Sequence, residues 1–246
     1  MRKERNWGAI ITAIVVGVIV LGTISAAVFW KLFNSIDFKK YVKSSSGEVA
    51  LIDTIIPANE DNGGIGDHVK GSADAPVVMF EYADYQCSGC ATANPRVNKL
   101  IEEYDGKLAV VYRNFLLSYH QNGTAAASAA EAAGLQGYWK EYADLLFANQ
   151  SVWASASGDT RTDLFVDLFN AASDGAGDVA KFKSDMNSSE VKKKINFDMG
   201  LGQSLDIPGT PSFYIDGERI DMSEISGEDG FLKLLREKID AKLAEN

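Results

Sequence analysis

The sequence predicts an α/β domain that carries a helical insertion and is preceded by one transmembrane helix. Two β-prone apolar runs, residues 77–80 and 108–115, flank a helix-forming stretch, which is the order of a strand–helix–strand unit with parallel strands. Residues 117–206 then contain no strand-like run, and residues 7–30 carry no charge. Together these segments indicate a sheet interrupted by helices, with a separate apolar segment before it.

The composition is that of one globular domain with an added apolar segment. Of the 246 residues, 46% are hydrophobic and 24% are charged, so the chain is too apolar to be disordered. The formal net charge of −10 gives nucleic-acid binding no electrostatic support. We therefore expect no nucleic-acid partner.

Residues 7–30 are predicted to form a transmembrane anchor behind a small basic cytoplasmic head, residues 1–6. A helix of this length spans about 36 Å, enough for a hydrocarbon core of roughly 30 Å. Trp7 and Trp30 mark its two ends. A cleaved signal peptide is the alternative, since residues 25–27 are small, but the apolar stretch exceeds the usual length of about 7 to 15 residues.

Residues 31–66 are predicted to be a linker between the anchor and the domain proper, residues 67–246. Its first part is polar and ends in a Ser/Gly cluster. Residues 48–56 are β-prone and are interpreted as an added edge strand or lid, which the Pro/Gly-rich residues 57–66 separate from the domain.

The only two cysteines of the chain stand two residues apart, after the first strand and just before a predicted helix over residues 91–104. A thiol at a helix N-terminus faces unpaired backbone N–H groups and the positive end of the helix dipole, which favour the thiolate. Cysteines in such positions titrate at roughly 3.5 to 7.5 instead of about 8.5. The pattern predicts a redox pair in which Cys87 is the nucleophile and Cys90, one helical turn deeper, is the resolving thiol.

Two other roles for Cys87 and Cys90 are weaker. A structural disulfide that closes so small a loop removes only roughly 2 kcal/mol of unfolded-chain entropy, which adds little to a chain long enough to form a full core. A zinc site needs four ligands, and the remaining candidates, His68 and His120, have no recognisable ligand spacing. We predict no metal site and expect both histidines to be structural.

The second half of the chain is predicted to insert helices, residues 117–206, before the last strands. Sheet structure returns at residues 211–220, where Asp216-Gly217 is the two-residue turn of a β-hairpin. An amphipathic helix over residues 231–243 closes the domain. Apolar residues at helical spacing place the inserted helices at residues 124–135, 138–149, 164–172, 179–186 and 191–205.

These elements resemble the thioredoxin-fold family of DsbA-like thiol-disulfide oxidoreductases, in the membrane-anchored form found in many bacteria. The resemblance depends on a combination: a strand leading into CxxC, a helical insertion, and Gly-Thr-Pro before a hairpin. It implies a thioredoxin-like fold from about residue 67 to the C-terminus. The matching residues are Asp67-His68-Val69, Ala75-Pro76-Val77, residues 80–90 (FEYADYQCSGC), Asn114-Phe115-Leu116, His120 and the alanine-rich helix after it, residues 145–150 (LLFANQ) and residues 207–213 (IPGTPSF).

The resemblance also implies roles for individual residues. Cys87 resembles the exposed attacking cysteine of the family, and Cys90 resembles its buried partner. Thr210 and Pro211 resemble the cis-proline turn that lies beside the disulfide and binds an extended substrate peptide; a cis peptide bond is tolerated mainly before proline. Glu81 resembles the buried acid that exchanges a proton with Cys90, with its pKa raised by desolvation. Pairing with a lysine or surface exposure are the alternatives for Glu81.

The dipeptide between the cysteines departs from the family. Strongly oxidising members carry Pro-His or a similar pair, whereas this chain has Ser88 and Gly89, so no imidazolium is available to stabilise the thiolate. The helix terminus and the backbone N–H groups of Ser88 and Gly89 must therefore contribute more to stabilising the thiolate. The redox potential, and with it the direction of electron flow, stays open.

The expected function is oxidation of dithiols in exported proteins with reduced cysteines, outside the cytoplasm, where disulfides form. The protein is expected to be a single-pass protein of the cell membrane without a cofactor of its own. The resemblance implies reoxidation by a quinone-linked membrane partner of the DsbB or vitamin K epoxide reductase (VKOR) kind. The alternatives are a disulfide reductase or isomerase on the same fold, a non-catalytic metal-binding or assembly protein, and a plain interaction module.

Overall fold

The computed structural model describes residues 36–41, 54–225 and 229–245, so the predicted anchor and head lie outside the described residues. The chain divides into two compact units, Met1–Lys40 and Tyr41–Asn246. Of the first unit only a few residues are described, including the start of a short 3-10 turn, η1 (Phe38–Tyr41). Among the described helices, none is both long enough and apolar enough to cross a membrane.

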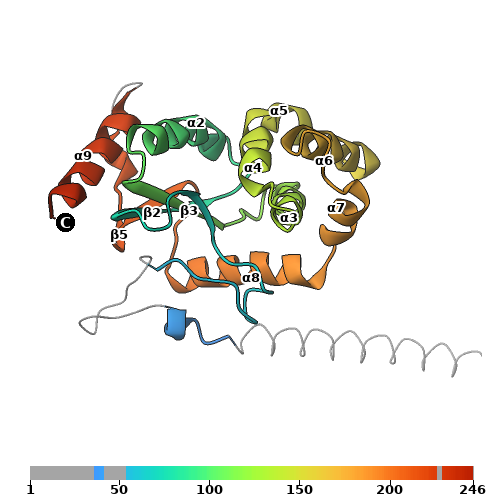
Figure 1. Cartoon of the computed structure of the whole chain (residues 1–246), viewed down its shortest axis with the longest axis horizontal. Helices are drawn as coiled ribbons and strands as arrows, with labels where there is room; N and C mark the ends of the chain where they lie inside the picture. Colours follow the sequence, from blue (N-terminus) through green and yellow to red (C-terminus); the bar gives the residue numbers. More distant parts are fainter. Residues whose placement is uncertain (1–35, 42–53, 226–228, 246) are drawn as a thin grey trace, which may run out of the picture. The chain divides into compact units, whose positions relative to one another are not determined.

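A five-stranded sheet of order β1-β3-β2-β4-β5 forms the centre of the second unit (Figure 1). β2 (Val77–Ala83) and β3 (Leu108–Asn114) are parallel, which confirms the predicted strand–helix–strand unit. β1 (His68–Gly71) pairs antiparallel with β3. β4 (Ser212–Ile215) pairs antiparallel with β2 and with β5 (Glu218–Arg219). The two central strands are almost wholly buried, which explains why their sequences are nearly continuous apolar runs.

The turn between β4 and β5 is the predicted Asp-Gly hairpin. Asp216 and Gly217 have φ angles of +50° and +80°. Two central residues with positive φ match the right-handed twist of the flanking strands, and Asp and Gly tolerate that conformation better than other residues.

Helices cover both faces of the sheet (Figure 1). α2 (Ser88–Glu103) and α9 (Gly230–Glu245) lie on one face, and α8 (Ser189–Ser204) lies on the other. The α2/α9 face buries apolar residues of β2 and β3 such as Met79 and Val110. Side chains alternate between the faces of a strand, so Glu81 faces α2 together with Met79.

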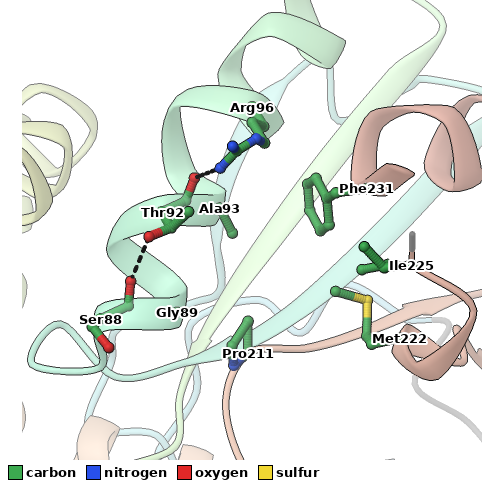
Figure 2. A pocket seen from close by; sticks show the side chains of 9 residues that line it. All are labelled: Ser88, Gly89, Thr92, Ala93, Arg96, Pro211, Met222, Ile225 and Phe231. Carbon is green, nitrogen blue, oxygen red and sulfur yellow. Dashed lines mark hydrogen bonds between the residues drawn. The ribbon is translucent and has the colours of Figure 1, made fainter. Parts of the chain in front are cut away.

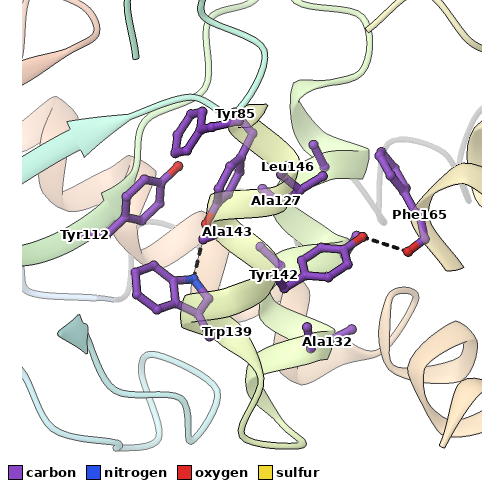
Figure 3. Packing of buried hydrophobic residues seen from close by; sticks show 14 of the residues in the cluster. Tyr85, Tyr112, Ala127, Ala132, Trp139, Tyr142, Ala143, Leu146 and Phe165 are labelled. Atoms are coloured by element: carbon purple, nitrogen blue, oxygen red, sulfur yellow. Dashed lines mark hydrogen bonds between the residues drawn. The ribbon is translucent and has the colours of Figure 1, made fainter. Parts of the chain in front are cut away.

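The predicted helical insertion is confirmed as a group of helices at one end of the sheet (Figure 1). Aromatic residues form its core: Trp139 donates a hydrogen bond from Nε1 to the Tyr85 hydroxyl (3.2 Å), and the Tyr142 hydroxyl donates to the Phe165 carbonyl (3.1 Å; Figure 3). With α8, the insertion consists of α3 (Gly123–Gly134), α4 (Trp139–Ala148), α5 (Gln150–Trp153), α6 (Gly158–Ala172) and α7 (Val179–Asp185).

The segment before β1 differs from the prediction. Residues 54–56 form no strand, residues 48–53 lie outside the described part, and the edge of the sheet is formed by β1. Residues 54–66, predicted to be part of the linker, contribute buried side chains to the domain, among them Ile56 and Ile65. The physical reason is side-chain hydrogen bonding: Asp67 accepts from the Ile56 N–H (2.9 Å), and Asn62 accepts from the Asn59 N–H (2.8 Å).

Candidate active site

Cys87 lies at the junction between β2 and α2. It is the N-cap residue of α2, which begins at Ser88, three residues earlier than predicted. Its N–H donates to the Asp84 carbonyl (3.0 Å) and its carbonyl accepts from the Ala91 N–H (3.0 Å). The predicted placement of the first thiol at a helix N-terminus is therefore confirmed.

Pro211, which directly precedes β4, also lies next to Cys87. β4 runs antiparallel to β2, with Ser212 opposite Tyr82, so the residue before β4 lies next to the bend that leads to Cys87. The Thr210–Pro211 peptide bond is cis, as the resemblance implies. The Cys87 Sγ lies 3.3 Å from the Thr210 carbonyl oxygen, to which the thiol donates.

Gly89 allows this close approach. A Cβ at this position would lie 3.1 Å from the Pro211 Cδ and 3.6 Å from the Cys87 Sγ. The first of these distances is tighter than most Cβ contacts, so a side chain here would require the Pro211 ring to shift by a few tenths of an ångström. Gly89, one of the two residues that depart from the family, thus permits the close approach of the helix and the turn.

The two thiols have opposite proton affinities. Both are unpaired in this structure; Cys87 is 9% exposed and Cys90 is fully buried. A hydrogen bond from the Cys90 thiol, together with the N–H groups of Cys90 and Gly89, outweighs burial and lowers the pKa of Cys87 to about 5. Burial, the hydrogen bond to Cys87 and the nearby charge of Glu81 raise the pKa of Cys90 well above its ordinary value.

Glu81 is buried under the pair, as the resemblance implies. Its side chain belongs to the strand that ends before Cys87, and only 4% of it is exposed. Burial raises its pKa to about 7, although the charge of Lys70 acts in the opposite direction. Of the two alternatives, surface exposure is not found. A lysine, Lys70, does act on Glu81 through its charge, but within the described part of the chain the Glu81 Oε1 has no hydrogen-bond partner.

The bend before Cys87 is held by residues that match the family but to which the sequence analysis assigned no role in the site. The buried carboxylate of Asp84 accepts from the Gln86 N–H (2.8 Å), the Leu117 N–H (2.9 Å) and the His120 ring (2.8 Å). The sequence did offer a signal for Asp84, because a polar residue that directly follows a buried strand is a candidate for such a role. Gln150 donates from Nε2 to the Tyr85 and Cys87 carbonyls (2.7 and 3.0 Å), a contact without a local sequence signal.

The two histidines occupy structural positions. His120 contacts Asp84, and His68 lies 2.7 Å from the Glu131 carboxylate and stacks on Trp139. In the described ranges, no cluster of three or more His, Cys, Asp or Glu side chains has an arrangement that could hold a metal ion.

A pocket of about 450 Å³ opens beside the dithiol (Figure 2). One wall is the exposed side of α2, and the opposite wall consists of the apolar side chains Met222, Ile225 and Phe231, with Pro211 at its base. Among the described residues that line it, Arg96 alone is charged, and its guanidinium donates to the Thr92 carbonyl (2.7 Å). The described lining therefore combines an apolar wall with the positive charge of Arg96.

A family model described as thioredoxin matches residues 64–235, which include the sheet, both cysteines and Pro211. The chain belongs to the thioredoxin family.

Solved structures of other proteins have a similar fold. Oxidised BdbD from Bacillus subtilis is 21% identical; the match covers 78% of this chain and 99% of that one, with a TM-score of 0.61. The α-DsbA1 protein of Wolbachia pipientis is 24% identical over 73% of this chain and 92% of its own, with a TM-score of 0.57. A thioredoxin-like oxidoreductase from Silicibacter pomeroyi is 23% identical, over 74% of this chain and 99% of that one, with a TM-score of 0.55.

The curated relatives of this thioredoxin-family chain are named Na(+)/H(+) antiporters. The Na(+)/H(+) antiporter NhaA 3 of Salinispora tropica is 32% identical over 170 residues, which are 69% of this chain and 24% of the antiporter. NhaA 1 of Mycobacterium sp. strain KMS is 28% identical over 208 residues, which are 83% of this chain and 31% of that protein. The chain thus spans a quarter to a third of the length of these relatives.

Proposed function

We propose that this chain is a thiol-disulfide oxidoreductase that acts outside the cytoplasm as a dithiol oxidase of exported proteins. The main support for the proposal is that Cys87 binds its proton weakly, whereas Cys90 binds its proton tightly. The pKa of Cys87 is lowered to about 5, and that of Cys90 is raised. A low pKa makes Cys87 a good leaving group and stabilises the reduced protein, which is the property of an oxidant.

The first step begins from the Cys87–Cys90 disulfide. A substrate thiolate attacks the Cys87 Sγ, the bond to Cys90 breaks, and its electron pair stays on the Cys90 sulfur. The products are a mixed disulfide between substrate and Cys87, and a Cys90 thiolate. Because the pKa of Cys90 is far above neutrality, this thiolate takes up a proton at once, and Glu81 is the acid placed to give it.

The second step releases the product. A second substrate thiolate attacks the substrate sulfur of the mixed disulfide, and Cys87 leaves as a thiolate. Two substrate thiols have then lost two electrons and two protons. The electrons reside on Cys87 and Cys90; one proton is on Cys90 and the other has passed to solvent, while Glu81 regains its proton from water.

The pocket beside the dithiol supports a protein substrate. Its apolar wall of Met222, Ile225 and Phe231 lies next to Pro211, so a side chain adjacent to the reacting cysteine would be buried there. In this proposal, Thr210 and Pro211 offer their backbone to the extended substrate segment. A partly apolar groove suits unfolded exported chains, whose apolar residues are exposed.

The reduced dithiol must be reoxidised in each cycle. We propose a quinone-linked membrane oxidase of the DsbB or VKOR kind, which would take both electrons from Cys87 and Cys90. The proposed anchor, residues 7–30, would hold the domain near such a partner in the cell membrane.

The direction of electron flow is tested by equilibrating the protein with reduced and oxidised glutathione and measuring the fraction of Cys87–Cys90 disulfide. We expect a potential above roughly −200 mV, more oxidising than the glutathione pool. Cys90→Ala should trap the mixed disulfide with glutathione, and Cys87→Ser should form none. A potential below roughly −270 mV would assign a reductase instead. Tight zinc or copper binding, without oxidation of a reduced protein, would assign a metal-binding protein.

A further inference from the structure

The mechanism above makes no use of Arg96, a partly exposed residue in the α2 wall of the pocket beside the dithiol. Its guanidinium donates one hydrogen bond, from Nη1 to the Thr92 carbonyl (2.7 Å). A guanidinium group carries five N–H donors in a planar fork. Within the described part of the chain no carboxylate pairs with Arg96, so most of this fork is available to a ligand.

This unpaired state sets Arg96 apart from other arginines of the described chain. Arg113 pairs with a buried aspartate, Asp67. Arg236 pairs with Glu103 on the surface. The chain has 34 acidic and 24 basic residues, so an acidic ligand meets a protein of like charge except where a cation such as Arg96 stands alone. The pocket is therefore complementary in charge to a carboxylate.

The guanidinium lies at a definite distance from the reacting sulfur. Gly89 marks the dithiol end of the pocket, because a Cβ on it would lie 3.6 Å from the Cys87 Sγ. Figure 2 shows Arg96 further along α2, with Phe231 across the pocket from it. The bond to Thr92 places the guanidinium near the level of that residue, three residues after Gly89. At about 1.5 Å per residue, this is roughly 5 Å along the helix.

This distance sets the register of an extended substrate. An extended chain rises about 3.3 Å per residue, and its side chains alternate in direction. When the substrate cysteine points at Cys87, the side chain two residues away, roughly 7 Å along, points to the same face. The adjacent side chains point away from it. A glutamate at that second position reaches the guanidinium of Arg96, whereas one at the third position does not.

We propose that Arg96 selects exported substrates that carry a carboxylate two residues from the reacting cysteine, through a bidentate ion pair with that carboxylate. This inference rests on the proposed function and narrows its substrate class. The apolar wall of Met222, Ile225 and Phe231 limits the water around such a pair, which strengthens it relative to a pair on open surface. Arg96 does not touch the sulfur atoms, so it acts on the binding of substrate and leaves the chemical step unchanged.

The experiment mixes the oxidised full chain with peptides that contain one cysteine. In each turnover two peptide thiols lose two electrons and form a peptide disulfide, while the Cys87–Cys90 bond breaks and both of its sulfurs are reduced. The reaction is stopped with acid, and the reduced protein is quantified. The peptides carry Glu or Gln at the second residue before or after the cysteine. The rate of each peptide with oxidised glutathione corrects for the effect of Glu on the thiol itself.

The wild-type protein should react at least about fivefold faster with the Glu peptide than with the Gln peptide, on one side of the cysteine. The difference should reside in the peptide concentration at half-maximal rate, because the chemical step is unchanged. It should shrink in about 1 M salt, which screens an ion pair that is open to solvent. Moving Glu to the third residue from the cysteine should remove most of it.

Four variants test whether this preference belongs to Arg96. Arg96→Met keeps an apolar stem and should abolish the preference. Arg96→Glu should reverse it, so that a Lys peptide reacts faster than the Glu peptide. Arg96→Lys keeps the charge without the planar fork and should retain part of it. Lys99→Met removes a charge from the next turn of α2, outside the described lining, and should change the ratio of rates by less than about twofold.

The outcomes separate this inference from the proposed function. Equal rates for the Glu and Gln peptides in the wild-type protein, or a preference that survives Arg96→Met, would overturn the role of Arg96 and leave the oxidoreductase standing. If Arg96→Met slowed only the reoxidation of the dithiol by native membranes, the charge would serve the membrane partner and the inference would be wrong. Oxidised wild-type protein that reacts with none of the peptides would overturn the proposed function.

Discussion

At the scale of single residues, the chemistry depends on how differently two neighbouring thiols are surrounded. Cys87 receives hydrogen bonds at a helix N-terminus, whereas Cys90, three residues on, faces the buried carboxyl group of Glu81. A separation of one helical turn is enough because the field of the unpaired N–H groups is confined to the first turn. The sulfur that is the more exposed of the two is therefore the one that ionises readily.

Glu81 should make the stability of the reduced protein depend on pH. Its pKa is about 7 in the folded state against 4.5 in the unfolded one. Below pH 4.5 both states are protonated and Glu81 costs nothing; between pH 4.5 and 7 only the unfolded state loses its proton, so folding becomes less favourable as pH rises. Glu81→Gln removes this penalty and should gain up to about 3 kcal/mol over wild type at pH 8.

Urea unfolding of both proteins under a reductant, at several pH values, measures this difference. Glu102→Gln, an exposed carboxyl group on α2, is the matched control and should change stability by less than about 0.5 kcal/mol at any pH. A constant difference between Glu81→Gln and wild type from pH 4 to 8 would show that Glu81 ionises normally in the folded protein.

The residues that we propose touch substrate or exchange its protons were expected from the sequence, but those that support them were not. Cys87 and Cys90 form a local motif whose chemistry is readable from neighbouring residues, whereas the roles of Pro211 and Glu81 came from the family resemblance. Gln150 acts through contacts that span 65 and 63 residues along the chain. Such contacts arise only once the helical insertion has packed against the sheet.

At the scale of elements, a buried ionic cluster joins β3, α8 and the start of β1. The Asp67 carboxylate lies 2.6 Å from the Arg113 guanidinium and 3.3 Å from the Lys194 ammonium group, which also contacts Asp198 at 2.7 Å. Burial would raise the pKa of Asp67, but the charges of Arg113 and Lys194 outweigh it and lower the pKa. The cluster fixes the edge strand on the side of the sheet opposite α2.

Breaking this cluster should destabilise the domain strongly. Arg113→Met leaves the Asp67 carboxylate buried without its main partner and should cost about 3 to 5 kcal/mol in the free energy of unfolding. Chemical denaturation of wild type and variant at neutral pH measures this change in the free energy of unfolding. Arg236→Met, which removes the exposed pair with Glu103, should cost far less, because solvent screens that pair. Equal losses in the two variants would mean that the buried cluster contributes no more than a surface pair.

The elements that the sequence predicts are those with a long periodic or continuous pattern. β2, β3 and the longer helices were found because they are 7 to 16 residues long. β1 was missed because its four residues, HVKG, contain one buried side chain, and that side chain is a lysine. α5, also four residues long, is too short to show helical spacing.

At the scale of the whole molecule, the sheet brings the site together from distant parts of the chain. The antiparallel pairing of β2 with β4 places Pro211 beside Cys87, although 123 residues separate Cys87 from its contact residue Thr210. The helical insertion between β3 and β4 then braces the bend from the other side through Gln150. The insertion therefore helps to shape the site.

The anchor prediction can be tested in cells. After brief treatment with a membrane-impermeant reductant, which opens the Cys87–Cys90 disulfide that the proposed partner maintains, a membrane-impermeant thiol reagent should label Cys87 of the full chain in intact cells, since its thiolate is present at neutral pH. The protein should sediment with the membrane, and a variant lacking residues 7–30 should not. Cys87→Ser controls for the specificity of labelling. Labelling that requires lysis would place the domain in the cytoplasm and contradict the proposed location.

The pKa of Cys87 tests the central claim most directly. Thiolate absorbance in the ultraviolet, recorded for the reduced protein from pH 3 to 10 and corrected with Cys87→Ser, gives the titration of that one sulfur. The proposed oxidase requires a midpoint of about 5, with Cys90 still protonated at the end of the range. A midpoint above pH 8, the ordinary behaviour of a free thiol, would contradict the claim that the end of α2 activates Cys87.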